Sequence, residues 1–141
     1  MRHYPSGQAG CAHRRRMGAR TYHLRWEQPI TLWAWANVDM SNDATLGYAD
    51  RFGVLCGTCH EHTAFDPMAQ ELLSLRLRLL IAMEGTTLSP QYLGLVIGEA
   101  FEKFESLKER CQKIEGQFVL LWNNSEFLFE ENRNTYSELL E

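Results

Sequence analysis

Apolar side chains recur at helical spacing between residues 67 and 84. The residues that step by four, three, four and three positions are Met68, Leu72, Leu75, Leu79 and Ala82. Spacing of this kind is typical of one face of a helix. Asp66-Pro67 supplies a capping residue followed by proline at the first helical position, and Gly85 supplies a stop signal. The pattern predicts a helix over 67–84.

A longer apolar pattern follows between two further signals. Ser89-Pro90 repeats the start signal and Gly116 repeats the stop signal, which predicts a helix over 90–115. One seam steps by four and three positions without a break, through Leu93, Ile97, Ala100, Phe104, Leu107, Cys111 and Ile114. Such a seam indicates coiled-coil-like packing against another helix.

The remaining stretches have mixed patterns. Residues 21–26 and 30–38 are rich in aromatic and β-branched side chains, which predicts two short strands. Residues 117–130 fit either a hairpin that turns at Asn123 or a helix, and the helix is favoured because the neighbouring segments are helical. Residues 130–141 are helical under both interpretations.

Together these elements predict a mainly α fold, a small bundle built on helices 67–84 and 90–115 and on a C-terminal helix. The N-terminal segment is expected to be irregular or short-stranded. Residues 1–20 predict a flexible basic arm, because they carry too little apolar surface to offset the entropy of ordering. An aromatic-rich segment at 21–40 and a helical domain at 41–141 complete the expected organisation.

The charge of the chain is modest and unevenly distributed. The 141 residues have a net charge of -4, so nucleic acid is not an expected partner. Six arginines and no acidic residue precede Trp26, but a run such as Arg14-Arg15-Arg16 is more often a solvated tail than a phosphate-binding arm. No stretch approaches the ~18 consecutive apolar residues of a membrane span, so no membrane partner is expected.

The densest group of chemically reactive side chains lies between residues 56 and 62. Four cysteines are too few for a disulfide-stapled secreted domain, which predicts a reducing, cytoplasmic location. The Cys56-x-x-Cys59 spacing allows two thiolates to reach one zinc ion, and His60 and His62 follow directly, so these four residues are the candidate metal ligands. The two histidines are too close in sequence to complete a tetrahedral zinc site easily. We therefore expect no cofactor, and zinc binding is the alternative.

Three other interpretations of this group stay open. The pentapeptide from Cys56 to His60 resembles the haem-attachment motif of c-type cytochromes, and this resemblance implies thioether attachment with His60 as an axial ligand. A reactive thiolate could support redox chemistry, although no βαβ pattern surrounds it. If residues 46–58 were helical, Cys56 and Cys59 would pack inside the protein as small hydrophobic side chains.

Catalytic motifs are absent from the sequence, which has no Gly-x-Ser-x-Gly, no phosphate-binding loop and no His-Glu-x-x-His, so enzyme activity is not expected. The leading hypothesis is a small helical interaction module, an adaptor, inhibitor or regulatory subunit, that binds another protein or itself. Leftover apolar surface on the helix predicted at 67–84 and the tryptophans before it favour this function. The candidate partner-binding residues are Trp26, Trp33, Trp35, Leu73, Leu77 and Leu80.

Overall fold

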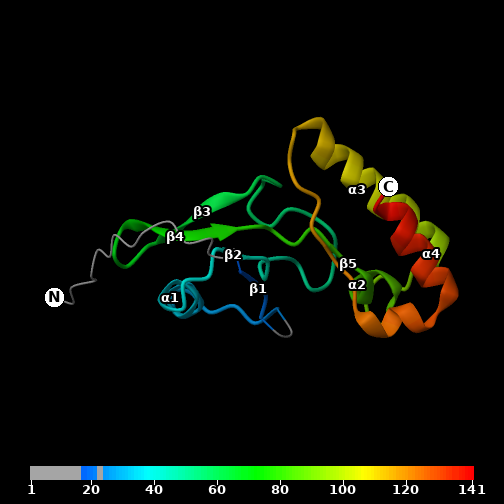
Figure 1. Ribbon diagram of the computed structural model, residues 1–141. Coiled ribbons are helices and arrows are strands. Elements are labelled where there is room, and N and C mark those ends of the chain that lie inside the picture. The colour runs from blue at the N-terminus through cyan, green and yellow to red at the C-terminus, as the bar shows by residue number, and fades with distance from the viewer. Residues whose placement is uncertain (1–16, 22–23) are drawn as a thin grey trace.

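The computed structural model describes residues 17–21 and 24–141, which fold into two lobes (Figure 1). Helices account for 37% and strands for 16% of these residues. The fold therefore belongs to the α/β class, and the mainly α prediction is wrong. Within the same residues, no helix combines the length and the apolar character that crossing a membrane requires.

The sheet lobe is a four-stranded sheet with α1 packed on one face. Its strands are β1 (Gly18–Ala19), β2 (Asn42–Asp43), β3 (His62–Asp66) and β4 (Glu71–Leu77), in the order β1-β2-β4-β3. β1, β2 and β4 run parallel, and β3 pairs antiparallel with β4 as a hairpin. The helix α1 (Ile30–Asn37) connects β1 to β2 and places Leu32 in a buried cluster with Ala64, Leu75 and Leu77.

The helical lobe surrounds Phe104. Its helices are α2 (Glu84–Leu88), α3 (Ile97–Lys113), the 3-10 helix η2 (Asn124–Leu128) and α4 (Glu130–Leu139), and a small parallel sheet joins β5 (Ala82–Met83) to β6 (Leu120–Leu121). The ring of Phe104 is fully buried, with its centroid 6.0 Å from that of Phe52 and 6.1 Å from that of Trp122. Because α3 and α4 lie side by side (Figure 1), both helices close over this core.

A third buried cluster joins the two lobes. It consists of Cys59 from the loop before β3, Ile81 from the segment before β5 and Cys111 from α3. The backbone N–H of Gln117 donates to the carbonyl of Cys59 at 2.8 Å. The lobes are therefore held together by packing and hydrogen bonding as well as by the covalent chain.

The helix predicted at 67–84 does not form, and most of its leucines belong to β4. Leu75 and Leu77 face the core, whereas Ser74 is exposed and Arg76 only half-buried. Apolar and polar residues alternate from Leu73 to Arg78, which is the period of a half-buried strand. The leucines satisfy both periods, and pairing with β2 and β3 selects the strand.

The start signal for that helix is in fact a turn signal. Asp66 Oδ1 accepts the backbone N–H of Met68 at 2.8 Å and that of Ala69 at 3.2 Å. An aspartate before a turn caps backbone N–H groups in the same way as one before a helix. Gln70 then takes a left-handed conformation, with φ of 57°, which reverses the chain into β4.

The helix predicted at 90–115 is confirmed over a shorter length, as α3. Ser89-Pro90 opens a turn, and Gly94 adopts a positive φ of 58° that is incompatible with a continuing helix. Within α3 the predicted seam is buried at Ala100, Phe104 and Cys111. Its two ends, Leu93 and Ile114, are exposed and lie outside the helix.

The flanking segments differ from expectation to different degrees. The strand predicted at 30–38 is the helix α1, in which Leu32 and Trp35 lie three positions apart and reach the same core. Residues 117–130 form neither a hairpin nor a continuous helix, but β6 followed by η2. The C-terminal helix is confirmed as α4. Residues 1–16 of the predicted arm, and part of the strand predicted at 21–26, lie outside the described residues.

Candidate functional site

A groove of about 590 Å³ lies between α1 and the β3–β4 hairpin. Trp33 of α1 lines it, and the indole N–H of this residue donates to Asp66 Oδ2 at 2.6 Å. The other carboxylate oxygen of Asp66 accepts two backbone N–H groups of the hairpin turn. One carboxylate therefore fixes the helix and the hairpin relative to each other.

Large apolar side chains are exposed in this groove and, at Phe65, on the opposite face of the hairpin. The exposed fraction is 50% for Phe65, 73% for Met68, 69% for Leu72 and 38% for Trp33. Phe65 and Leu72 are register partners across β3 and β4, which places their side chains next to each other on one face of the sheet. We define the hairpin surface as Trp33, Phe65, Asp66, Met68, Glu71 and Leu72.

The lining of the groove is acidic. It includes Asp39, Asp66 and Glu71, and no lysine or arginine among the described residues. The hydrogen bond from Trp33 lowers the pKa of Asp66, and the backbone N–H groups of the turn add to this effect against the opposing effect of burial. The carboxylate is therefore ionised at neutral pH.

The residues predicted to bind a partner are divided between the groove and the interior. Trp33 and Leu73 line the groove. Leu77 and Leu80 are only 8% and 1% exposed, so they belong to the core. The half-buried residues that pack against the sheet core are Trp26 and Trp35.

Three exposed apolar residues of the hairpin surface, Phe65, Met68 and Leu72, were not among the predicted partner-binding residues. Asp66-Pro67 is also a turn signal, and interpreting it as one would place Met68 at a hairpin tip. The alternating run after residue 72 would then be a strand that pairs back on Phe65. The sequence therefore contained a signal for the hairpin, but the helical spacing of the leucines competed with it.

The four predicted metal ligands lie in different environments. Cys56 and His60 are exposed, whereas Cys59 is buried in the cluster that joins the lobes. His62 lies at the start of β3, where its Nδ1 is 3.2 Å from the carbonyl oxygen of His60. In residues 17–21 and 24–141 no three His, Cys, Asp or Glu side chains form a group that could hold a metal ion. The zinc site stays a prediction.

Cys59 instead faces Cys111. Both thiols are free, and both are nearly fully buried. Burial raises the pKa of Cys111 to about 12, and the hydrogen bond with Cys59 adds to the increase. The thiol of Cys111 is therefore protonated at neutral pH and behaves as a core side chain.

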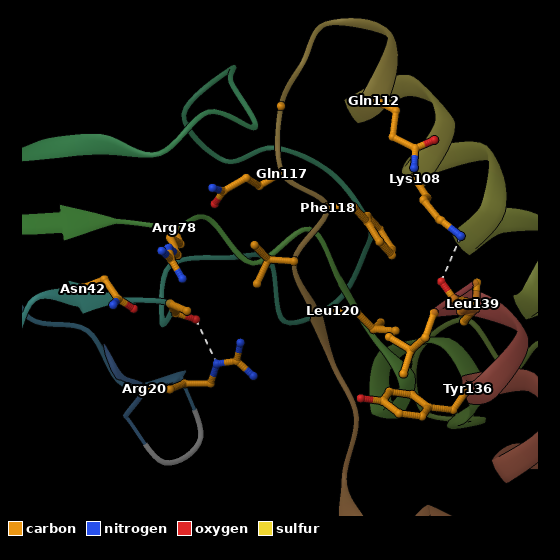
Figure 2. Close-up of a pocket in the computed structure, with 14 residues that line it drawn as sticks. Arg20, Asn42, Arg78, Lys108, Gln112, Gln117, Phe118, Leu120, Tyr136 and Leu139 are labelled. Carbon is orange, nitrogen blue, oxygen red and sulfur yellow. Dashed lines mark hydrogen bonds between the residues drawn. The ribbon is translucent and has the colours of Figure 1, made fainter. Parts of the chain in front are cut away.

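A larger cavity of about 670 Å³ lies between the lobes (Figure 2). Arg20 and Arg78 line it from the sheet lobe, and Lys108 lines it from α3. Phe118 and Leu120, from the segment that returns from α3, supply apolar surface. Among the described residues, no aspartate or glutamate lines this cavity.

Two buried carboxyl groups, Asp43 and Glu84, interact electrostatically with Arg20. Each of these acids is 1% exposed, and burial raises the pKa of both. Thr45 donates its hydroxyl and its backbone N–H to Asp43, and Asn123 donates its amide to Glu84 Oε1. Glu84 Oε2 is buried without a hydrogen-bond partner among the described residues.

No family model, no curated protein and no solved structure matches this chain. A functional hypothesis therefore depends on the chemistry of the two surface features. The hairpin surface is apolar and acidic, whereas the cavity between the lobes combines apolar and basic groups. Because the hairpin surface is acidic and the cavity is lined by basic residues, the two fit ligands of opposite charge.

Proposed function

We propose that the chain is a small protein-interaction module, an adaptor, inhibitor or regulatory subunit, that binds a partner protein through the hairpin surface. The observation that carries the proposal is the exposure of Phe65, Met68 and Leu72 together at one end of the sheet. Contiguous exposed apolar residues mark interaction sites, and aromatic residues and methionine are enriched at the centres of interfaces.

The charge of the groove indicates the chemistry of the partner. Asp66 is buried and already accepts three hydrogen bonds, but Glu71 is exposed beside Leu72, and no lysine or arginine is among the described residues that line the groove. A segment that combines apolar side chains with lysine or arginine would bury its apolar part on the hairpin surface and pair its charge at the rim. Acidic or purely polar segments would be disfavoured.

The position of β3 favours an extended partner segment. β3 is the last strand in the sheet order, so no strand of the described residues pairs with its outer side. An edge strand offers unpaired backbone groups to which a further strand can add. Pairing along β3 would bring the partner next to Phe65.

We place this interaction in the cytoplasm. The three described cysteines are free thiols, and Cys59 and Cys111 stay unlinked although they lie in one cluster. Free thiols are typical of proteins in a reducing compartment.

Selection from a displayed random-peptide library, with the full chain as bait, tests the proposal. We expect enriched peptides to combine aromatic or aliphatic residues with lysine or arginine. The double variant Met68→Gln/Leu72→Thr should bind these peptides about tenfold more weakly or worse, because it removes the exposed apolar side chains while keeping polar residues suited to a turn and a strand.

The matched control is Leu128→Gln. Leu128 is 82% exposed, but it lies on η2 in the helical lobe, so this variant should keep the affinity of the native sequence. Failure to enrich any peptide, or equal binding to the double variant, would contradict the proposal. Light scattering that shows a dimer dissociated by Met68→Gln/Leu72→Thr would also overturn it, by making a second copy the occupant of this surface.

A further inference from the structure

Two arginines face the cavity between the lobes from the sheet side. Arg20 Nε donates to the carbonyl of Ala44 at 3.0 Å, and Figure 2 shows the rest of the guanidinium directed into the space between the lobes. Arg78 Nε donates to Glu61, a carboxylate that also accepts a hydrogen bond from Arg76. Neither of these bonds uses the terminal nitrogens of Arg20 or Arg78. Such pairs of N–H groups bind carboxylate and phosphate oxygens in a bidentate manner.

Lys108 supplies a third cation from the opposite wall. Its Nζ donates to the carbonyl of Leu139 at 2.9 Å and lies 3.4 Å from Glu105 Oε1. Because an ammonium group has three donors, one N–H remains after these two contacts. The bond to α4 also orients the side chain, so the cation is positioned before any ligand arrives.

The rest of the lining divides into amide and apolar groups. Asn42 and Gln117 lie beside the arginines, and Figure 2 shows Gln117 pointing toward Arg78. Phe118 points instead toward α3, and Leu120 and Leu139 continue the apolar wall. The lining therefore has a cationic, amide-rich side and an apolar side.

We propose that this cavity binds a small organic anion, in which one carboxylate or phosphate group is attached to an apolar body. The cavity volume of about 670 Å³ lies within the range of small-molecule sites, and the boundary between two lobes is a common place for such sites. The anionic group contacts Arg20 and Arg78, and the apolar body packs on Phe118 and Leu120. The site lies apart from the hairpin surface and does not depend on its function.

Titration with two probe anions tests this site and separates its two possible ligand chemistries. Phenylacetate represents a carboxylate and phenyl phosphate represents a phosphate, while benzyl alcohol and inorganic phosphate each offer only one half of the ligand. We expect at least one of the two anions to bind saturably in calorimetry and to shift the amide resonances of residues 117–120. Benzyl alcohol and inorganic phosphate should bind about tenfold more weakly or worse, because each lacks one set of contacts.

Single variants connect binding to the three cations. Arg20→Gln, Arg78→Gln and Lys108→Gln should each weaken binding about tenfold, as expected for the loss of a charged hydrogen bond. Lys113→Gln is the matched control, since Lys113 is exposed on the same helix as Lys108 and does not line the cavity. Circular dichroism checks folding, and Arg78→Gln and Lys108→Gln decide the test if Arg20→Gln fails to fold.

The following outcomes would overturn the proposal. The first is that neither phenylacetate nor phenyl phosphate shows saturable binding. The second is that benzyl alcohol binds as tightly as the anions. The third is that all folded cavity variants bind the anions like the native sequence. Resonance shifts confined to the hairpin surface would likewise refute it.

Discussion

Trp33 and Asp66, which are 33 positions apart in sequence, are joined by a hydrogen bond of 2.6 Å from the indole N–H to the carboxylate. This bond fixes the eight-residue helix α1 to the hairpin turn. Because the hairpin surface is built from both elements, its geometry depends on the ionised form of one aspartate.

We expect Asp66→Asn to lower the melting temperature at neutral pH. The pKa of Asp66 is lowered, mainly by the bond from Trp33, so its carboxylate stabilises the folded state above the unfolded pKa of about 4. This contribution is lost as pH falls through the lower folded pKa. Circular dichroism melts at several pH values should therefore show the difference from the native sequence shrinking in acid. A difference that stays constant with pH would contradict this role.

Glu84→Gln should change the pH dependence of stability in the opposite sense. Burial raises the pKa of Glu84, so the neutral carboxyl contributes stability that is complete below the unfolded pKa and is lost as pH rises through the folded pKa. We expect urea midpoints of the native sequence to fall relative to Glu84→Gln as pH rises above about 4, the unfolded pKa of glutamate. Glu99→Gln, which changes an exposed glutamate on α3, is the control variant.

Gly116→Ala should destabilise the protein by about 1–3 kcal/mol, because the added methyl group would overlap the sulfur of Cys59. Adding Cys59→Ala removes the sulfur, so the double variant should lose less stability than the sum of the two single variants. Gly98→Ala on α3 is the control, since nothing lies within 4 Å of a methyl group there. If the changes in unfolding free energy of the two single variants simply add in the double variant, as measured by urea unfolding, the contact between residue 116 and Cys59 is not tight.

Thiol labelling should separate the cysteines by their environment. Cys56 is exposed and should react with iodoacetamide in the folded protein, whereas the buried Cys59 and Cys111 should react only after local unfolding. Mass spectrometry of peptides from a labelling time course measures the three rates separately. The same experiment with added zinc tests the predicted metal site, because joint protection of Cys56 and Cys59 is expected only if both bind the ion.

Phe104→Ala should cost about 3–5 kcal/mol in the free energy of unfolding, because its ring is fully buried against Phe52 and Trp122. Leu128→Ala, at a residue that is 82% exposed, should change stability by less than about 0.5 kcal/mol. Urea denaturation followed by tryptophan fluorescence compares the two variants. A small effect at Phe104 would mean that this side chain does not anchor the helical lobe.

The parts of the fold that could be predicted are those with a single periodic pattern. In α3 only a helix places Ala100, Phe104 and Cys111 on one face, so the sequence leaves no competing structure. Between residues 71 and 77 the leucines satisfy the helical and the strand period together, and the choice is made by pairing with β2, which is distant in sequence. The capping residue Asp66 could not resolve this ambiguity, because it serves a turn and a helix equally.

The candidate sites were predictable only in part for a related reason. Trp33 was expected at a binding surface because tryptophan favours interfaces, and Leu73 because it belonged to the apolar surface of a predicted helix. Both line the groove, although Leu73 reaches it from a strand. The cavity between the lobes has no local signature, because Arg20, Lys108 and Tyr136 are brought to it by separate elements. A site made by the meeting of two lobes becomes visible only when their arrangement is known.

The contact between Gly116 and Cys59 also restricts how the two lobes can move. Gly116 lines the cavity at the end of α3, and its neighbour Gln117 is hydrogen-bonded to the backbone of residue 59. The same contact is reinforced by the packing of Cys59 against Ile81 and Cys111. Gly116 and Gln117 therefore tie one wall of the cavity to the loop that carries Cys59, so a side chain added at residue 116 would change the shape of the cavity as well as the stability of the protein.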